Sequence, residues 1–195
     1  MAHDRAARPQ ARSLRLFVAV DVPDEVRELV RQAVAPLRER FPRARWVPPQ
    51  NQHVTVKFLG ATWPRLVEPV KRAIAQVAAG QAPFRTRVSG LGAFPSARRA
   101  RVLWASLEDP EGRLAAIAQA LDAALAADFR PETRPFTAHL TVARFEPTVP
   151  LEDLAEIALD TPSFTVEAIV LYRSHLRRPA PVYEPLEIFP LGPGR

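Results

Sequence analysis

The sequence predicts an α+β fold with two lobes of mainly antiparallel sheet, related by a pseudo-twofold axis, with outer helices and a cleft between the lobes. Pairs of expected strands separate the helices, and this order favours antiparallel sheets over strict β-α alternation. The segment QHVTVKFL at 52–59 recurs 86 residues later as AHLTVARF at 138–145, so each half of the chain carries one copy. A chain of 195 residues can bury a sizeable core as one domain or as two small lobes that share a sheet system.

Residues 1–13 form a polar segment rich in arginine and alanine, without the apolar stretch of a secretory signal. We expect a disordered tail over 1–13 and a single bilobed domain over 14–195.

The first half of this domain is expected to run strand, helix, strand, strand, helix. Leu14–Val20 is apolar except for Arg15, a composition typical of a buried strand. A helix is expected to start near Asp24, and Pro36 should end or kink it. The remaining expected elements are a short strand at 45–47, a strand at 53–59 closed by Gly60, and a helix at 67–79 preceded by a turn or frayed helix at 63–68.

The second half is expected to run strand, strand, helix, strand, helix, strand, strand. Asp109 and Pro110 give a start signal for its first helix, in which Leu114, Ile117 and Leu121 recur at helical spacing. The glycines at 90–92 begin a dinucleotide-binding pattern that Pro95 breaks, so 90–95 is expected to be a connecting loop. The other expected elements are strands at 84–89, 102–107, 138–145, 164–172 and 183–189, a short helix at 151–159 and a basic loop at 174–181.

Each copy of the repeated segment places a histidine two residues before a threonine: His53 with Thr55, and His139 with Thr141. Side chains alternate between the two faces of a strand, so each histidine shares a face with its threonine while the apolar residues share the other face. A single copy is explained as well by a strand-end histidine bonded to a neighbouring hydroxyl. Two copies with matching flanks indicate a functional site instead. If the two halves pack about a pseudo-twofold axis, both His/Thr faces meet across one cleft.

General acid–base catalysis is the chemistry that fits this pair of motifs. The chain has no cysteine, no His-x-x-x-His or His-Glu-x-x-His spacing, and no acidic residue near either motif, so we expect neither a metal site nor a cofactor. Gly-x-Ser-x-Gly and P-loop patterns are also absent from the sequence. Histidine has an ordinary pKa of about 6.5, so one ring can act as a base and the other as an acid. In phosphoryl transfer the base activates the nucleophile, the acid protonates the leaving oxygen, and hydroxyls hold the non-bridging oxygens.

With these motifs the chain resembles the 2H phosphoesterases and, among them, the RNA 2′,3′-cyclic phosphodiesterases, once called 2′-5′ RNA ligases. The resemblance extends from Arg15 to about Pro190. Besides the two motifs, the matching segments are RLFVAV at 15–20, WVP at 46–48, KFLG at 57–60, RVLW at 101–104, RPF at 134–136, and LYRS at 171–174 with Tyr183 following.

The resemblance implies a bilobed α+β fold and metal-independent hydrolysis of RNA 2′,3′-cyclic phosphate ends to 2′-phosphomonoesters. It implies that His53 protonates the leaving ribose oxygen and that His139 activates water. It also implies that Arg144 contacts the phosphate, although its odd offset from His139 requires the strand to end or bulge first. The predicted substrate-binding residues are Thr55, Thr141, Arg144, Phe17, Tyr172 and Ser174, of which the two aromatic residues are candidates to stack on a base.

The net charge of +6 rests on 25 arginines and 2 lysines. The guanidinium fork suits phosphate, so an RNA or oligonucleotide partner fits this charge, although arginine-biased codon usage would give the same composition. No apolar run approaches about 18 residues, and the lack of cysteine fits a reducing cytoplasm. We therefore expect a cytoplasmic monomer without a membrane partner.

Two alternative functions remain open at this point. A 2′-5′ RNA ligase would use the same chemistry with a ribose hydroxyl replacing water, and no residue separates it from the hydrolase. A module that mainly binds nucleotides such as AMP would keep the cleft, but the intact histidine and threonine pairs in both motifs argue against it.

Overall fold

The computed structural model describes residues 12–193, so residues 1–11 of the predicted disordered tail lie outside the described residues. The strands are β1 (Leu14–Val20), β2 (Arg45–Trp46), β3 (Val54–Thr62), β4 (Phe84–Thr86), β5 (Val88–Phe94), β6 (Ala100–Leu107), β7 (His139–Val149), β8 (Phe164–Val166), β9 (Ala168–His175) and β10 (Val182–Pro190). The helices are α1 (Asp24–Ala33), α2 (Ala35–Arg40), α3 (Pro64–Ala79) and α4 (Arg113–Ala124), with 3-10 turns η1 (Pro49–Asn51), η2 (Ala97–Arg99) and η3 (Leu154–Glu156). Over 12–193, no helix has the length and apolarity needed to cross a membrane.

One eight-stranded sheet dominates the fold. Its strand order is β10-β9-β1-β3-β7-β6-β5, and β2 pairs with β7 on the edge opposite β6, beyond the contact with β3. The pairings are antiparallel, and the small β4–β8 sheet is antiparallel as well. The large sheet has two parts, which β3 and β7 join through the single residue pair Val54 and Leu140. The predicted α+β class with mainly antiparallel sheet and two lobes is therefore confirmed.

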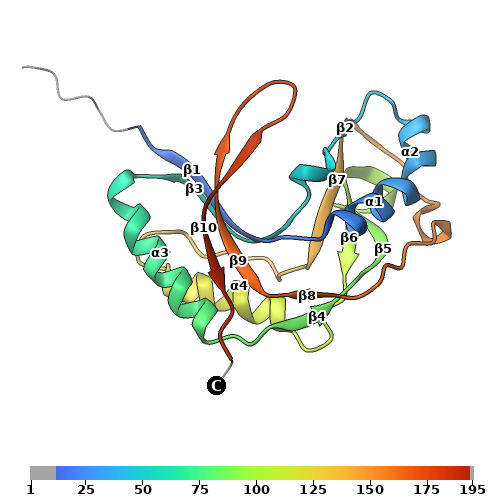
Figure 1. Cartoon of the computed structure of the whole chain (residues 1–195). Helices are drawn as coiled ribbons and strands as arrows, with labels where there is room; N and C mark the ends of the chain where they lie inside the picture. The colour runs from blue at the N-terminus through green and yellow to red at the C-terminus, as the bar shows by residue number, and fades with distance from the viewer. Residues whose placement is uncertain (1–11, 194–195) are drawn as a thin grey trace, which may run out of the picture.

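The helices lie outside the two groups of strands (Figure 1). Helices α3 and α4 contact each other, and they cover the group β10-β9-β1-β3 through contacts with β3, β9 and β10. Helices α1 and α2 lie at the opposite end of the molecule, beside the group β7-β6-β5 (Figure 1). The lobes are therefore interlaced in sequence, since the N-terminal α1 and α2 lie beside the second lobe and the C-terminal hairpin β9–β10 completes the first. The two halves of the sequence therefore do not each form one lobe.

Several predicted strand boundaries are wrong because the strands pass through residues that were expected to end them. Strand β3 continues beyond Gly60 to Thr62, because Gly60 takes a φ of +66° at an irregularity in the pairing with β1. A glycine adopts this conformation without the steric cost of a Cβ. Strand β5 likewise occupies most of the predicted loop 90–95. The predicted strands 84–89 and 164–172 each divide in two, one part joining β4–β8 and the other the large sheet.

Two predicted helices also differ from the structure. Helix α3 starts at Pro64, within the segment expected to be a turn or frayed helix, and it accommodates Pro69 in its interior. Pro69 costs one backbone hydrogen bond, and the burial of Val70, Ile74 and Ala78 against the core offsets that loss. The predicted helix at 151–159 is wrong, since only the 3-10 turn η3 forms there. So short a segment does not nucleate a helix without strong capping.

Candidate active site

The pairing of β3 with β7 brings the two repeated motifs together. Val54 pairs with Leu140, and the catalytic candidates His53 and His139 directly precede these two residues. Because the strands run antiparallel about this pair, Thr55 is directed toward His139, and the second-motif threonine is directed toward His53. The apolar residues of both motifs are buried, whereas the histidines and threonines are partly exposed. The predicted division into an apolar face and a polar face is therefore present in both copies.

Each motif strand bulges one residue after its threonine. Against β1, Thr55 pairs with Ala19 and Lys57 with Val18, which leaves Val56 without a partner. A bulge reverses the alternation of faces beyond it. The residue after the bulge, Lys57, therefore turns into the interior, where it is 5% exposed, and Phe58 turns outward.

Strand β7 repeats this irregularity. Thr141 pairs with Trp104 and Ala143 with Leu103, which leaves Val142 without a partner on β6. Ala143 is consequently buried, and Arg144 is exposed on the same face as Thr141. Arg144 lines a cavity together with Thr141, as described below. The strand thus bulges before Arg144, which was one of the two conditions for Arg144 to reach the site.

Buried Lys57 ties the first motif strand to the segment that leads into the second motif. Its ammonium pairs with Asp122 of α4 and donates a hydrogen bond of 3.0 Å to the carbonyl of Arg130. A buried ammonium needs such partners, because burial without them costs several kcal/mol, of the order of 3–5. Lys57 therefore links β3 to α4 and to the segment before the second motif.

Aromatic rings surround His53. Phe17 stacks on the imidazole with 4.7 Å between ring centroids, and Tyr183 meets it edge-on at 5.2 Å. Tyr172 lies 6.2 Å away and stacks on Phe17 at 5.2 Å. Burial lowers the pKa of His53 to about 4. The hydrogen bond from the ring to the Asn51 carbonyl acts in the opposite direction, but its effect is smaller than that of burial. The ring is therefore neutral at pH 7.

His139 has a related but more open environment. Its Nδ1 lies 2.7 Å from the carbonyl oxygen of Thr137, so Nδ1 carries the hydrogen and donates it, and Nε2 stays free. The rings of Phe94 and Trp104 meet the imidazole edge-on at 5.4 and 6.0 Å. Burial lowers the pKa of His139 below its ordinary value, and the positive charge of Arg144 lowers it further. In both motifs, a carbonyl two residues before the histidine holds the ring.

A polar network behind His53 fixes the chain that enters the first motif. The Arg27 Nε donates to the carbonyl of Gln52 at 3.1 Å, and the same guanidinium pairs with Asp24 at 2.8 Å. The Tyr172 hydroxyl donates to Asp21 at 2.8 Å. Burial and the charge of Asp21 raise the pKa of Tyr172, so this donor keeps its proton. The sequence predicted no role for Arg27, because a position outside the apolar stripe of its helix carries no signal of the contact with Gln52, although the side chain is only 14% exposed.

A cavity of about 1380 Å³ adjoins the motifs and collects four of the predicted site residues: Thr55, His139, Thr141 and Arg144. Arginines 101, 130 and 134 also line it, as do Phe58, Phe94 and Phe136. His53, covered by its aromatic neighbours, lies beside this cavity and does not belong to its lining. The pairing of Val54 with Leu140 keeps it close to the second motif, and a positive charge on His139 would add to the lowering of the His53 pKa that burial causes.

The other predicted binding residues are placed differently. Phe17 is only 4% exposed, so it has almost no surface left for a base. Tyr172 is half-buried and bonded to Asp21. Ser174 is half-buried on β9 opposite Tyr183, and the residues that line the cavity do not include it.

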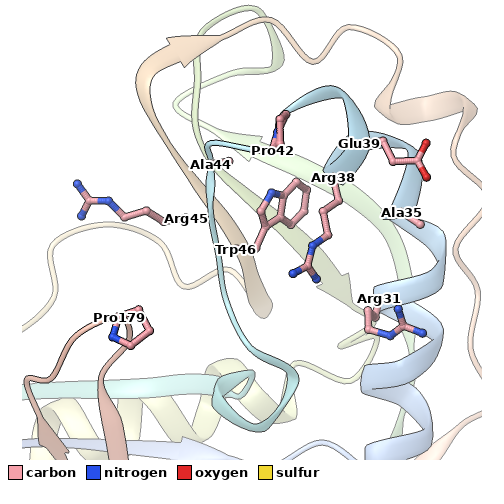
Figure 2. Close-up of a pocket in the computed structure, with 9 residues that line it drawn as sticks. All are labelled: Arg31, Ala35, Arg38, Glu39, Pro42, Ala44, Arg45, Trp46 and Pro179. Carbon is pink, nitrogen blue, oxygen red and sulfur yellow. The ribbon is translucent and has the colours of Figure 1, made fainter.

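A second hollow, of about 690 Å³, lies between α1, α2 and the segment before β2, and contains no motif residue (Figure 2). In Figure 2, Arg38 extends alongside Trp46, whereas Arg45 points to the other side of β2, the strand that carries both Arg45 and Trp46. Over 12–193, no group of three or more His, Cys, Asp or Glu side chains is arranged to hold a metal ion.

Comparison with known proteins places this arrangement among related enzymes. The model of the family described as LigT like Phosphoesterase matches residues 20–104 and 107–183. The chain is 35% identical over 188 residues to the RNA 2′,3′-cyclic phosphodiesterase of Thermus thermophilus, covering 91% of this chain and 90% of that protein. It is 30% identical over 184 residues to the protein of that name from Methanothermobacter thermautotrophicus, covering 91% of this chain and 99% of the relative. A relative of the same name from Geobacillus stearothermophilus is 31% identical over 90% of this chain, which spans only 56% of that longer protein.

Solved structures agree with these sequence matches. The crystal structure of TT0787 from Thermus thermophilus has a TM-score of 0.76 at 31% identity, covering 93% of this chain and 99% of that one. Escherichia coli LigT complexed with 3′-AMP has a TM-score of 0.72 at 25% identity, covering 92% of this chain and 99% of that one.

Proposed function

Because this chain belongs to the LigT-like phosphoesterase family, a 2H family, we propose that it hydrolyses RNA 2′,3′-cyclic phosphate ends to 2′-phosphomonoesters. The observation that carries the proposal is the antiparallel pairing of two His-x-Thr strands through Val54 and Leu140. This pairing gives two imidazoles and two hydroxyls on adjacent strands beside a cavity rich in arginine. The name shared by the curated relatives supports the same reaction.

The reaction needs a base and an acid on opposite sides of the phosphorus. In the proposed step, the free Nε2 of His139 takes a proton from water as the water oxygen bonds to phosphorus. The bond from phosphorus to the ribose 3′ oxygen breaks, and His53 gives its proton to that oxygen. The product carries the phosphate on the 2′ oxygen and a free 3′ hydroxyl. General acid and base groups of this kind each contribute typically about 10²–10⁴ in rate.

The acid role of His53 requires the substrate itself to change the protonation of the ring. With a pKa of about 4, His53 is neutral at pH 7 before substrate binds. An anionic phosphodiester bound next to the imidazole favours its charged form and raises its pKa. His53 thus gains its proton together with the substrate, whereas His139 enters the reaction as the neutral base.

Three residues of the cavity lining hold the phosphate in this proposal. The hydroxyls of Thr55 and Thr141 donate to the non-bridging oxygens, and the exposed guanidinium of Arg144 offers two parallel donors. We propose that Phe17 and Tyr172 orient and bury His53 and do not stack on a base. That Ser174 contacts the substrate stays a prediction. That residues 14–195 form a single domain also stays a prediction.

Ligation remains the alternative with a specific basis, because the same two histidines serve if a ribose 5′ hydroxyl takes the position of water. The nucleotides complexed with E. coli LigT, namely 3′-AMP, ATP and NADP+, show that this related protein accommodates nucleotides. For the present chain, the cavity of about 1380 Å³ gives room for more than one nucleotide, which supports both outcomes.

Hydrolysis is expected to proceed in EDTA and to place the phosphate on the 2′ oxygen. The measurement incubates a 2′,3′-cyclic-phosphate oligonucleotide with the protein and chelator, with a 5′-hydroxyl oligonucleotide added as an acceptor, and maps the product phosphate. His139→Ala protein, prepared identically, is the control for contaminating nuclease. Activity lost in chelator and restored by a metal ion, or a 3′-phosphate product, would refute the proposal. A 2′-5′-linked product in place of hydrolysis would favour the ligase.

A further inference from the structure

Arg15 lies on the same face of β1 as the ring that covers His53. Side chains two residues apart share a face of a strand, so Arg15 and Phe17 face the same way. Phe17 stacks on His53 at 4.7 Å, and Leu16, which points to the other face, is buried in the core. Arg15 itself is exposed. The arginine therefore stands on the active-site side of the sheet, about 7 Å along the strand from Phe17.

The register of the neighbouring strands places two hydroxyl groups in line with this arginine. In the pairing of β1 with β9, Leu16 lies opposite Arg173. One further step in this register sets Arg15 opposite Ser174, and Ser174 pairs with Tyr183 of β10. Residues that lie directly opposite each other share a face of the sheet. Arg15, Ser174 and Tyr183 therefore form a row across three strands on the active-site side.

The Tyr183 end of this row adjoins the site of the reaction. The Tyr183 ring meets His53 edge-on at 5.2 Å. Burial raises the pKa of Tyr183, and the positive charges of Arg144 and Arg15 both act to lower it. The hydroxyl thus lies near one guanidinium from each lobe. The row leads from the neighbourhood of Arg144, past His53, to Arg15.

The donors of the row have no partner within the protein. Over residues 12–193, the guanidinium of Arg15 forms no ion pair, and the hydroxyls of Ser174 and Tyr183 form no hydrogen bond. The other face of the β9–β10 hairpin differs, since Arg173 there lies 4.0 Å from the carboxylate of Glu184. A guanidinium beside two hydroxyls offers several donors and one positive charge, which is the chemistry that binds a phosphate group.

The direction of the proposed reaction indicates which phosphate this is. His53 protonates the 3′ oxygen of the terminal ribose, so this ribose lies on the His53 side of the reacting phosphorus, whereas water enters from the His139 side. The row continues from His53 away from the groups that hold the reacting phosphate. The next anion of an RNA chain in this direction is the phosphodiester on the 5′ side of the same ribose.

We infer that Arg15, together with the hydroxyls of Ser174 and Tyr183, binds the phosphodiester that joins the 3′-terminal nucleotide to the nucleotide before it. The inference rests on the proposed function, and it adds a subsite through which the protein favours an RNA end over a single cyclic nucleotide. Because the contact is with the backbone, it is independent of the base sequence.

The test compares two dinucleotides that end in a 2′,3′-cyclic phosphate. One has the natural phosphodiester, and the other has an uncharged methylphosphonate in its place, so they differ only at the group that Arg15 is inferred to bind. Arg15→Ala is expected to lower the ratio of their kcat/KM values about 5- to 20-fold, between the losses typical of an exposed ion pair and of a charge-assisted hydrogen bond. Tyr183→Phe removes only the hydroxyl and should lower the ratio about 2- to 10-fold. Arg85→Ala removes an exposed arginine from β4 and should leave the ratio unchanged.

An unchanged ratio in Arg15→Ala would overturn the inference, whether both substrates lose activity equally or neither does, because the effect would then be independent of the phosphodiester charge. A fall of the same size in Arg85→Ala would assign the effect to net charge and would also overturn it. Failure of the wild-type protein to hydrolyse either compound would count against the proposed function alone. In that case, the Kd values of the two intact dinucleotides, measured by calorimetry, decide the inference. Arg15→Ala weakens binding of the phosphodiester compound alone, about 5- to 20-fold, if the subsite exists, and affects both compounds equally otherwise.

Discussion

Replacing His53 or His139 by alanine is expected to lower kcat about 10²–10⁴-fold on a 2′,3′-cyclic-phosphate oligonucleotide. Each variant removes one of two proton transfers that occur in the same step, and neither threonine can replace an imidazole in it. The double variant should be little slower than either single variant, because the two groups act as a unit. The measurement is single-turnover and steady-state kinetics of the three variants beside wild type.

The control for this experiment is a third histidine of the same chain. His175 lies on β9, where its Nε2 is 2.7 Å from a carboxylate oxygen of Glu184, and it is not part of the cavity lining. His175→Ala should retain the wild-type rate. Equal melting temperatures for the active-site variants and wild type would show that turnover, and not folding, was lost. A single variant that kept more than about a tenth of the wild-type rate would exclude the acid–base role of that residue.

Replacing Arg144 by alanine is expected to lower kcat/KM about 10²–10³-fold, the usual loss when one donor to a developing negative charge is removed. The reason lies in the bulge at Val142, which turns Arg144 to the face of Thr141. Lysine keeps the charge but loses the planar fork, so Arg144→Lys should fall between wild type and alanine.

Arg85→Ala gives the matched control for Arg144, since Arg85 is an exposed arginine on β4 in the separate two-stranded sheet. It removes the same charge from the molecule without touching the cavity. If both arginine variants lost activity equally, the effect would come from net charge, and the assigned phosphate contact would be wrong. An unaffected Arg144→Ala variant would lead to the same conclusion.

The sequence was sufficient to predict the two motif strands, the α+β class and the order of most elements, because these features depend on local patterns. Alternation around His53 and His139 predicted the apolar and polar faces of both strands. The first strand, Leu14–Val20, has the same limits in the structure as in the prediction. Each of these features is encoded by residues close together in the chain.

Features that depend on pairing between distant strands could not be predicted in the same way. The bulges after Thr55 and Thr141 arise from the register of β3 with β1 and of β7 with β6. The local sequence pattern at these positions predicts regular alternation. Phe17 was a candidate to stack on a base, although aromatic residues in such strands more often belong to the core. In the structure, β9 and β10 bring Tyr172 and Tyr183 around His53, and Phe17 is enclosed with them. No local signal indicates that segments more than a hundred residues apart form one aromatic cluster.

The central claim, that two imidazoles act as acid and base, predicts a bell-shaped dependence of kcat/KM on pH. The rate rises as the base loses its proton and falls as the acid loses its own. The pKa of His53 is lowered to about 4 and that of His139 lies below its ordinary value, both chiefly through burial. Since kcat/KM reports the free protein, its optimum is expected on the acidic side of about pH 6.5. The bound anion raises both pKa values, so the optimum of kcat is expected at higher pH.

The most direct test is therefore the pH profile of kcat/KM for wild type, His53→Ala and His139→Ala, measured from about pH 3 to 9 with chemistry rate-limiting. Wild type should give the bell. The residual activity of His139→Ala should lose the acidic limb, and that of His53→Ala should lose the basic limb. The opposite assignment of limbs would exchange the roles of the two histidines. A wild-type profile that is flat over the whole range would contradict paired acid–base catalysis by His53 and His139.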